Sequence, residues 1–308
     1  PGVVYTTTET HHCVAKAAHL AGIQPDRVRA LRPDGRFRMR VDDLKAAIAE
    51  DRAAGLQPFL VVSSAGTTNT GAVDPLPAIG ELCRREGLWH HCDGAYGAFF
   101  HMVPELRGQL AGLSDADSLT LDPHKGLFLP YGTGAVLVRD GEALRRAHAA
   151  TADYLPPPGD GFYDPSQYGP ELSRDFRGLR LWLPFQLHGV ARFRAALAEK
   201  RELAVDCARR LAEIPGLVLD AEPELSLFPF HVEWPGSTVD EQSDASRQLM
   251  ERVTARGRVM VTGAEVGGRY LGRVCVLCFR TRARHIDHAV EDIAAVTAEI
   301  LAERGVGA

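Results

Sequence analysis

The sequence predicts an α/β protein: a large domain built on a mostly parallel sheet, followed by a smaller α+β domain. Three observations support this prediction. The chain has 308 residues, which is enough for two domains. In its first half, short apolar runs alternate with segments of helical periodicity, as in βαβ units. The segment PFLVVSS, residues 58–64, begins as an unbroken apolar run, as expected for a strand covered on both faces.

The elements of the first half follow from β-branched runs and from helix boundary residues. Strands are expected at residues 3–7, 28–31, 58–64, 88–92, 118–121 and 135–138. Helices are expected at residues 14–20, 42–54 and 75–86. Gly22 and Gly55 should end the first two helices, and Asp42 should cap the second. Parallel strands joined in this way bring their carboxyl ends to one edge of the sheet, where ligands bind.

The second half of the chain changes character at residues 151–174, which are rich in Pro, Gly and Tyr. We expect a functional lid or a disordered segment there. Further strands are expected at 217–219, 226–234, 258–261 and 272–279, and helices at 179–213, where Pro184 is a potential break, 240–256 and 283–301. The predicted domains are residues 1–180, which include the mobile loop 151–174, a connecting helix at 181–215, and the small domain 216–308.

Composition argues against several classes of function. The formal net charge is −5 and no basic stripe carries interleaved aromatics, which argues against nucleic-acid binding. No apolar run approaches the length of a membrane span and no signal peptide opens the chain, so we expect a cytoplasmic protein. The six cysteines are scattered and are expected to be reduced. Cys275 and Cys278 lie in an apolar run and are expected to be buried.

Lys125 and Asp93 are the strongest candidates for a reactive site. Each lies just past the end of an expected strand, and so does Thr67. A lysine among buried elements suits Schiff-base chemistry. Pyridoxal phosphate needs such a lysine to hold its aldehyde and a carboxylate to keep its ring nitrogen protonated. The alternatives are a solvated turn lysine and a helix-capping aspartate, but the two residues together favour the cofactor site.

Histidines lie next to these turns. His11 and His12 either belong to a capping turn or place one imidazole flat on the cofactor ring. His124 is either a turn residue or reaches the phosphate or the substrate carboxylate. The run His90-His91-Cys92-Asp93 does not predict a metal site, because neighbouring strand residues point to opposite faces and no second ligand pair has a suitable spacing.

Three motifs identify a family that the chain resembles. GTTNTGA at 66–72, DGAYG at 93–97 and DPHK at 122–125 occur in this order, and THHCVAKAAHLAGI and FRGLRLWL extend the match over nearly the whole length. The chain resembles the pyridoxal-phosphate-dependent group II amino-acid decarboxylases, which act on aromatic amino acids, glutamate and diaminobutyrate. The resemblance implies pyridoxal 5′-phosphate as cofactor and the fold of PLP-dependent transferases (fold type I), with a mostly parallel sheet of the seven-stranded type.

The resemblance also implies roles for the residues around the cofactor ring. Lys125 would form the internal aldimine, and Asp93 would pair with the pyridinium nitrogen. Ala95 would lie against the ring, His11 would stack on its opposite face, and Thr67 would lie near its edge substituents.

Further implied roles concern the phosphate and the proton transfer. His124, and more weakly Asp122, would help at the phosphate. Tyr154, in the loop 151–174, would protonate the quinonoid carbon after CO2 leaves, which favours plain decarboxylation over oxidative aldehyde formation.

Two departures from the family pattern bear on substrate and partners. Gly126 stands where many members have tryptophan, which weakens an aromatic-substrate interpretation. The family's N-terminal region, with its phosphate-binding turn, is absent. We therefore expect either a fragment or one chain of a split enzyme, acting as a homodimer or as a heteromer whose second chain supplies that segment. The substrate side chain has unranked candidate contacts at Phe99, Phe100, His101 and Arg280.

The predicted function is decarboxylation of an L-amino acid to the amine and CO2. One alternative is another fold-type-I reaction, such as that of an aminotransferase or a lyase, which would not be expected to keep Tyr154 in such a loop. The other is a non-catalytic partner subunit of a decarboxylase.

Overall fold

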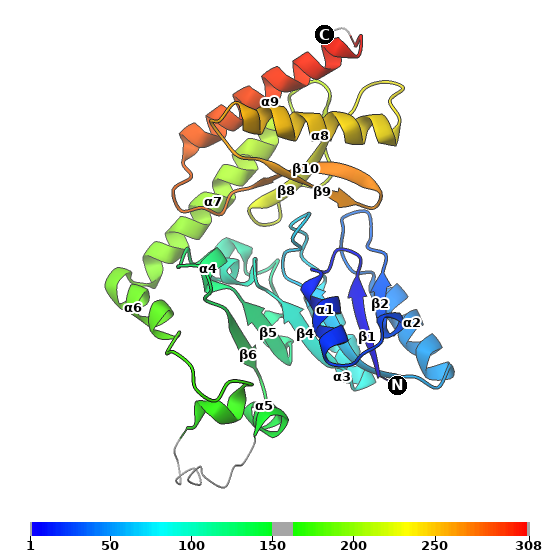
Figure 1. The fold of residues 1–308 in the computed structure, drawn as a ribbon, viewed down its shortest axis with the longest axis vertical. Helices are drawn as coiled ribbons and strands as arrows, with labels where there is room; N and C mark the ends of the chain where they lie inside the picture. The colour runs from blue at the N-terminus through cyan, green and yellow to red at the C-terminus, as the bar shows by residue number, and fades with distance from the viewer. Residues whose placement is uncertain (1, 150–162, 307–308) are drawn as a thin grey trace.

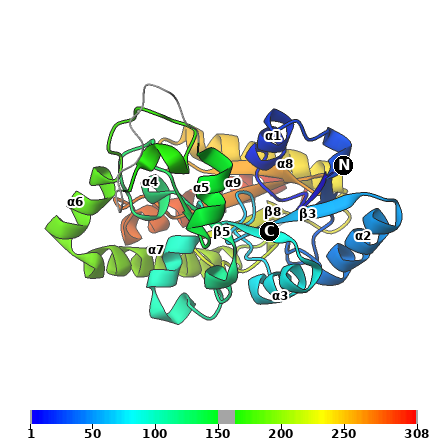
Figure 2. The same ribbon diagram turned by 90° about the horizontal axis from the view of Figure 1, so that it is seen from below.

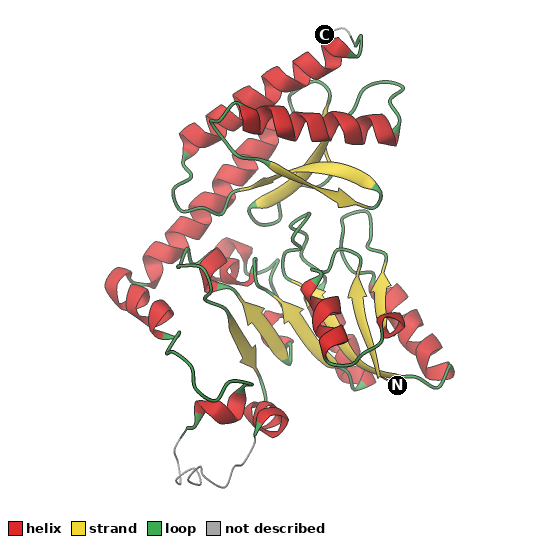
Figure 3. Ribbon diagram, in the orientation of Figure 1, coloured by secondary structure: helices red, strands yellow, loops and turns green. Residues whose placement is uncertain are grey.

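The computed structural model describes residues 2–149 and 163–306, which form two sheets, each with its own helices (Figures 1 and 3). The larger sheet has six strands in the order β2-β1-β3-β4-β5-β6. They are β1 Gly2–Thr7, β2 Val28–Leu31, β3 Gln57–Ser64, β4 Trp89–Asp93, β5 Ser118–Leu121 and β6 Ala135–Val138. All neighbouring pairs are parallel except β5 and β6. The predicted α/β fold is confirmed, with six strands in the described ranges where the resemblance implied seven.

Among the described residues, five helices belong to the larger sheet, and the first three of them join its parallel strands. They are α1 Cys13–Leu20, α2 Val41–Ala53, α3 Leu76–Glu86, the short α4 Pro123–Gly126 and α5 Gly141–His148. Figure 2 shows α2 and α3 on one side of β3 and α1 on the other. Leu44 and Ile48, one turn apart on α2, are buried against the sheet. Each such side chain contributes about 1.5 to 3 kcal/mol to folding.

The connection to the small domain consists of two helices, α6 Leu179–His188 and α7 Val190–Leu211. The single helix predicted over 179–213 breaks at Gly189, not at Pro184. Gly189 has φ 72° and ψ 150°, a conformation that side chains with a Cβ avoid, so the chain turns there. Pro184 is accommodated inside α6.

The small domain has a four-stranded antiparallel sheet in the order β7-β8-β10-β9. Its elements are β7 Leu217–Leu219, β8 Leu227–Val232, α8 Val239–Ala255, β9 Thr262–Val266, β10 Arg269–Cys275 and α9 Ala283–Glu303. Figure 1 shows α8 and α9 on the side of this sheet away from the large domain. The sheet packs on α7, α8 and α9 through a core that includes Phe228, Phe230 and Ile293.

The hairpin of this sheet corrects two predictions. The strand predicted at 258–261 is wrong, because β9 begins at Thr262, and the strand predicted at 272–279 ends at Cys275. The turn is Gly267-Gly268, with φ values of 58° and 84°, and it sets the pairing of β9 with β10. Cys275 and Cys278 are exposed rather than buried.

Within the described ranges, no helix combines the length and apolar character needed to cross a bilayer.

Tyr96 joins the two domains. Its hydroxyl accepts a hydrogen bond from the Ser226 backbone N–H at 2.9 Å and lies 2.9 Å from the Ser226 Oγ. Tyr96→Phe should lower the free energy of unfolding by about 1 to 3 kcal/mol, because it leaves the buried Ser226 N–H without a partner. Urea denaturation measures this loss. Tyr270→Phe is the control, because that hydroxyl has no hydrogen-bond partner among the described residues. Equal effects of the two substitutions would contradict the bridging role.

Candidate functional site

The loops after β3, β4 and β5 meet at one edge of the larger sheet. Asp93 is the last residue of β4 and pairs with Thr120 on β5, two residues before Asp122. The Gly94 N–H donates to the Thr120 carbonyl at 3.1 Å, and the Ala65 N–H donates to the Asp93 carbonyl at 2.8 Å. Register alone therefore brings the strand-end residues to a common edge, as the βαβ pattern predicted.

Glycines allow these loops to approach closely. A Cβ on Gly97 would lie 2.0 Å from the Ala65 carbonyl oxygen, so only glycine fits there. Thr67 is buried in the loop after β3, with its hydroxyl 2.6 Å from Thr70 Oγ1 and accepting from the Ala72 N–H at 3.2 Å. The Thr67 hydroxyl thus stabilises the loop that contains it through hydrogen bonds within that loop.

Lys125 lies on α4, one turn after Asp122. Its Nζ is 2.8 Å from Asp122 Oδ2, so the ammonium is matched by a carboxylate, although the lysine side chain is 43% exposed. Gly126 is buried, and a Cβ there would lie 2.9 Å from the Phe99 side chain. The Phe99 ring therefore occupies the space beside Gly126.

His124 anchors α4 to the following turn. Its Nδ1–H donates to the Thr133 carbonyl at 2.8 Å, and its ring meets the Tyr131 ring edge-on at 4.9 Å between centroids. Its Nε2 lies 3.8 Å from Asp122. Since Nδ1 is occupied by the backbone, Nε2 is the nitrogen that faces the site.

His11 faces the same charges from the loop between β1 and α1. Burial lowers the pKa of His11, and the neighbouring His12 and the Lys125 ammonium lower it further, whereas the carboxylates of Asp93 and Asp122 raise it. Charges act appreciably only within about 10 Å in salt solution, so His11 lies near these three charged side chains. The structure thus brings together four of the predicted site residues: His11, Asp93, Asp122 and Lys125.

Ala95 follows Asp93 in the loop after β4. The Ala95 N–H donates to Asp93 Oδ1 at 3.1 Å, which holds one carboxylate oxygen toward the loop. Tyr154 lies outside the described residues.

Two further residues lie beside the site and were given no role there from the sequence. Burial raises the pKa of the Cys13 thiol, and the carboxylate of Asp93 raises it further. His91 lies on the same face of β4 as Asp93, with Nδ1 2.7 Å from Ser118 Oγ and Nε2 3.1 Å from Thr120 Oγ1. The i, i+2 spacing of His91 and Asp93 was the sequence signal for this neighbour. Among the described residues, no three His, Cys, Asp or Glu side chains are grouped to hold a metal.

The four candidate substrate contacts lie in different environments. Phe100 is completely buried in the core, and the Arg280 guanidinium lies over the Phe279 ring at 5.2 Å. Phe99 and His101 line a cavity of about 480 Å³ beside β5 and β6, on the face of Leu119. His91 and Thr120 lie on the opposite face.

A lysine and a carboxylate at neighbouring strand ends of a mostly parallel sheet, with an imidazole beside them, define a site of the kind found in pyridoxal-phosphate enzymes of the α/β class. Residues 2–233 match the family described as the pyridoxal-dependent decarboxylase conserved domain. The chain belongs to this family.

Individual relatives agree with the family match. An aromatic-L-amino-acid decarboxylase of Bacillus atrophaeus is 33% identical over 302 residues, 97% of this chain and 63% of that protein. The pig aromatic-L-amino-acid decarboxylase is 30% identical, over 97% of this chain and 60% of that protein. The crystal structure of Oryza sativa TDC with PLP and tryptamine superposes with a TM-score of 0.92 at 28% identity, covering 97% of this chain and 63% of that one. The chain thus spans about three-fifths of the length of these relatives.

Proposed function

We propose that this chain carries the cofactor-binding lysine of a pyridoxal-phosphate-dependent enzyme that decarboxylates an L-amino acid to the amine and CO2. The observation that carries the proposal is the placement of Asp93 at the end of β4 and of Lys125, paired with Asp122, just past the end of the neighbouring strand β5, with His11 near both. Several relatives, among them the Bacillus protein and a tryptophan decarboxylase of Camptotheca acuminata, are decarboxylases by name, which favours this reaction class.

The donor set fits the cofactor at its ring and aldehyde. Lys125 is the amine that would hold the aldehyde, Asp93 the carboxylate that would keep the ring nitrogen protonated, and His11 the imidazole that would cover one face. When bound, the cofactor supplies an electron-withdrawing ring that makes loss of the substrate carboxylate feasible. Asp122 holds the Lys125 amine at 2.8 Å, and His124, as an imidazolium, would donate its Nε2–H to an anionic group while Nδ1–H stays bonded to Thr133.

We also propose that a second polypeptide segment, within a homodimer or a heteromer, completes the binding site for the cofactor phosphate. Within the described ranges, the site offers the phosphate His124 but no helix start rich in glycine and serine. The edge strand β6 supports an additional segment, because Val136 and Leu137 point to opposite faces and are 55% and 56% exposed. The greater length of the relatives is consistent with this proposal.

The decisive experiment combines cofactor binding with product analysis. The chain, alone and mixed with a candidate second segment, is incubated with pyridoxal phosphate and a panel of L-amino acids, and CO2, amine, keto-acid and aldehyde products are measured. Amine and CO2 in equal amounts are expected. A keto acid without CO2 would indicate an aminotransferase, and cofactor binding without any product would indicate a non-catalytic subunit.

Tyr154→Phe tests the assignment of the proton donor. If Tyr154 protonates the substrate carbon, the substitution should leave cofactor binding unchanged while amine formation falls by about 10²-fold or more. In air, aldehyde should then appear, with one O2 and one water consumed and with CO2, ammonia and hydrogen peroxide released. Product analysis by mass spectrometry measures both. Tyr163→Phe is the matched control in the same part of the chain. Unaltered products would remove Tyr154 from the role of acid.

A further inference from the structure

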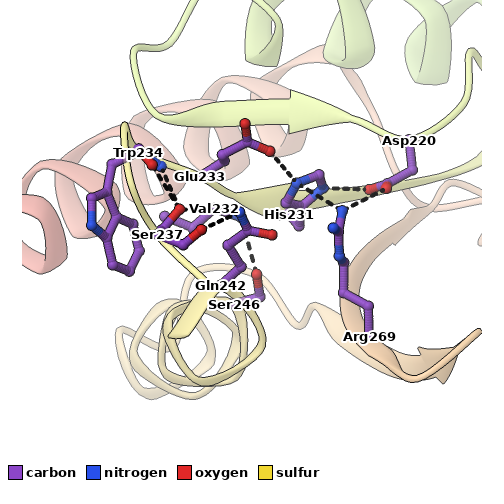
Figure 4. A network of polar contacts seen from close by, with 9 residues as sticks. All are labelled: Asp220, His231, Val232, Glu233, Trp234, Ser237, Gln242, Ser246 and Arg269. Carbon is purple, nitrogen blue, oxygen red and sulfur yellow. Dashed lines mark hydrogen bonds and ion pairs between the residues drawn. The ribbon is translucent and has the colours of Figure 1, made fainter. Parts of the chain in front are cut away.

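His231 lies on the face of the small sheet that looks toward the large domain. On β8, Phe228, Phe230 and Val232 point into the core of the small domain, so the alternating residues point the other way. Leu227, which has the same orientation as His231, packs in the core of the large domain. The His231 imidazole is 3% exposed and is surrounded by polar groups (Figure 4).

Three charged side chains reach the two nitrogens of this ring. Nδ1 lies 2.8 Å from Asp220 Oδ2, and Nε2 lies 3.0 Å from Glu233 Oε2. Arg269 Nη1 also approaches Nε2, at 3.2 Å. Burial lowers the pKa of His231, but the carboxylates of Asp220 and Glu233 outweigh burial, so the pKa lies above the ordinary 6.5.

The two contacts at Nε2 require different protonation states. A carboxylate accepts only, so a hydrogen bond to Glu233 needs a proton on Nε2. A guanidinium donates only, so a hydrogen bond from Arg269 needs a free lone pair on Nε2. The two cannot form together. The contact to Asp220 keeps a proton on Nδ1 in either state.

We propose that His231 is a protonation switch. Its Nε2 bonds to Glu233 in one protonation state and to Arg269 in the other, and the state of the ring thereby sets the position of Arg269. In the imidazolium, Nε2–H donates to Glu233, and Arg269 is left facing Asp220, 3.9 Å away. When the proton leaves to solvent, Nε2 accepts from Arg269 and Glu233 is released to water. The switch is independent of the proposed decarboxylase activity.

Arg269 transmits the switch to a cleft between the domains. This cleft, of about 740 Å³, is lined by Arg269 and by the loops that follow β1 and β2. The other charged groups that line the cleft are Glu9, Arg32, Asp34, Asp220 and Glu265. Glu9 is buried two residues before His11, so the cleft adjoins a loop that leads to the candidate site. A change in the position of the Arg269 guanidinium therefore changes how close its positive charge lies to that loop.

Side-chain NMR on the full chain, with or without cofactor, tests the switch directly. A pH titration of the ¹⁵N-labelled imidazoles identifies which His231 nitrogen keeps its proton on the alkaline side. The expected result is the Nδ1–H tautomer, with Nε2 free to accept from Arg269. An Nε2–H tautomer would overturn the proposal, because Glu233 would then hold Nε2 in both states.

Two substitutions provide a second measurement. Glu233→Gln should lower the His231 midpoint and Arg269→Gln should raise it, each by about 0.5 to 1 unit, since both partners are partly exposed and screened. Glu251→Gln and Arg284→Gln, on exposed positions of α8 and α9, are the charge-matched controls and should leave the midpoint unchanged. Midpoints that do not respond to either test substitution would overturn the switch.

Discussion

Lys125→Ala should abolish covalent attachment of pyridoxal phosphate and reduce decarboxylation by at least about 10³-fold, the order of loss expected when a residue that bonds covalently during catalysis is removed. The structural reason is that Lys125 is the lysine that lies at the strand ends, paired with Asp122 and near Asp93 and His11. The cofactor band in the visible spectrum should disappear with the activity.

Because the chain has few lysines, the lysine that carries the cofactor can be identified directly. The only other lysines in the sequence are Lys16, Lys45 and Lys200. Lys200 is completely buried, with its amine donating to the Thr281 carbonyl, and Lys45 lies exposed on α2. After borohydride reduction, peptide mapping should place the cofactor on Lys125 alone.

Lys45→Ala is the matched control and should keep both the band and the activity. Cofactor attached to another lysine in the unaltered chain would refute the site, whatever the activity. If the cofactor maps to Lys125 but no amine forms, the site stands and the proposed reaction does not.

Asp93→Asn should keep the covalent attachment but lower decarboxylation by about 10² to 10³-fold, the effect expected when one preorganised electrostatic partner is lost. Asparagine preserves the size of the side chain and an oxygen for the Ala95 N–H, so the loop after β4 should be retained. What it removes is the negative charge that would keep the ring nitrogen protonated.

The readouts for Asp93 separate this electrostatic role from a folding role. Urea denaturation should show little change in Asp93→Asn, while the absorption maximum of the bound cofactor shifts. Asp115→Asn, on the surface turn before β5, is the control. Activity equal to that of the unaltered chain would exclude Asp93 as the partner of the ring nitrogen.

Much of the fold was predictable because it depends on local patterns. The buried strands β3 and β4, the amphipathic α2 and the turn before Lys125 each follow from residues close together in the chain. The errors arose where a local signal was outweighed or overlooked: Gly189 rather than Pro184 breaks the connecting helices, and Gly267-Gly268 fixes the register of β9 with β10.

The sequence by itself determined the order of the strands and helices, and with them the strand-end positions of Asp93 and Lys125, because apolar periodicity and turn residues act over short stretches. Only the tertiary structure decided which side chains from separate segments contact one another. The packing of Phe99 against Gly126 and the competition of Glu233 and Arg269 for His231 depend on how the helices, strands and loops dock. Such contacts depend on distances between segments that no local pattern encodes.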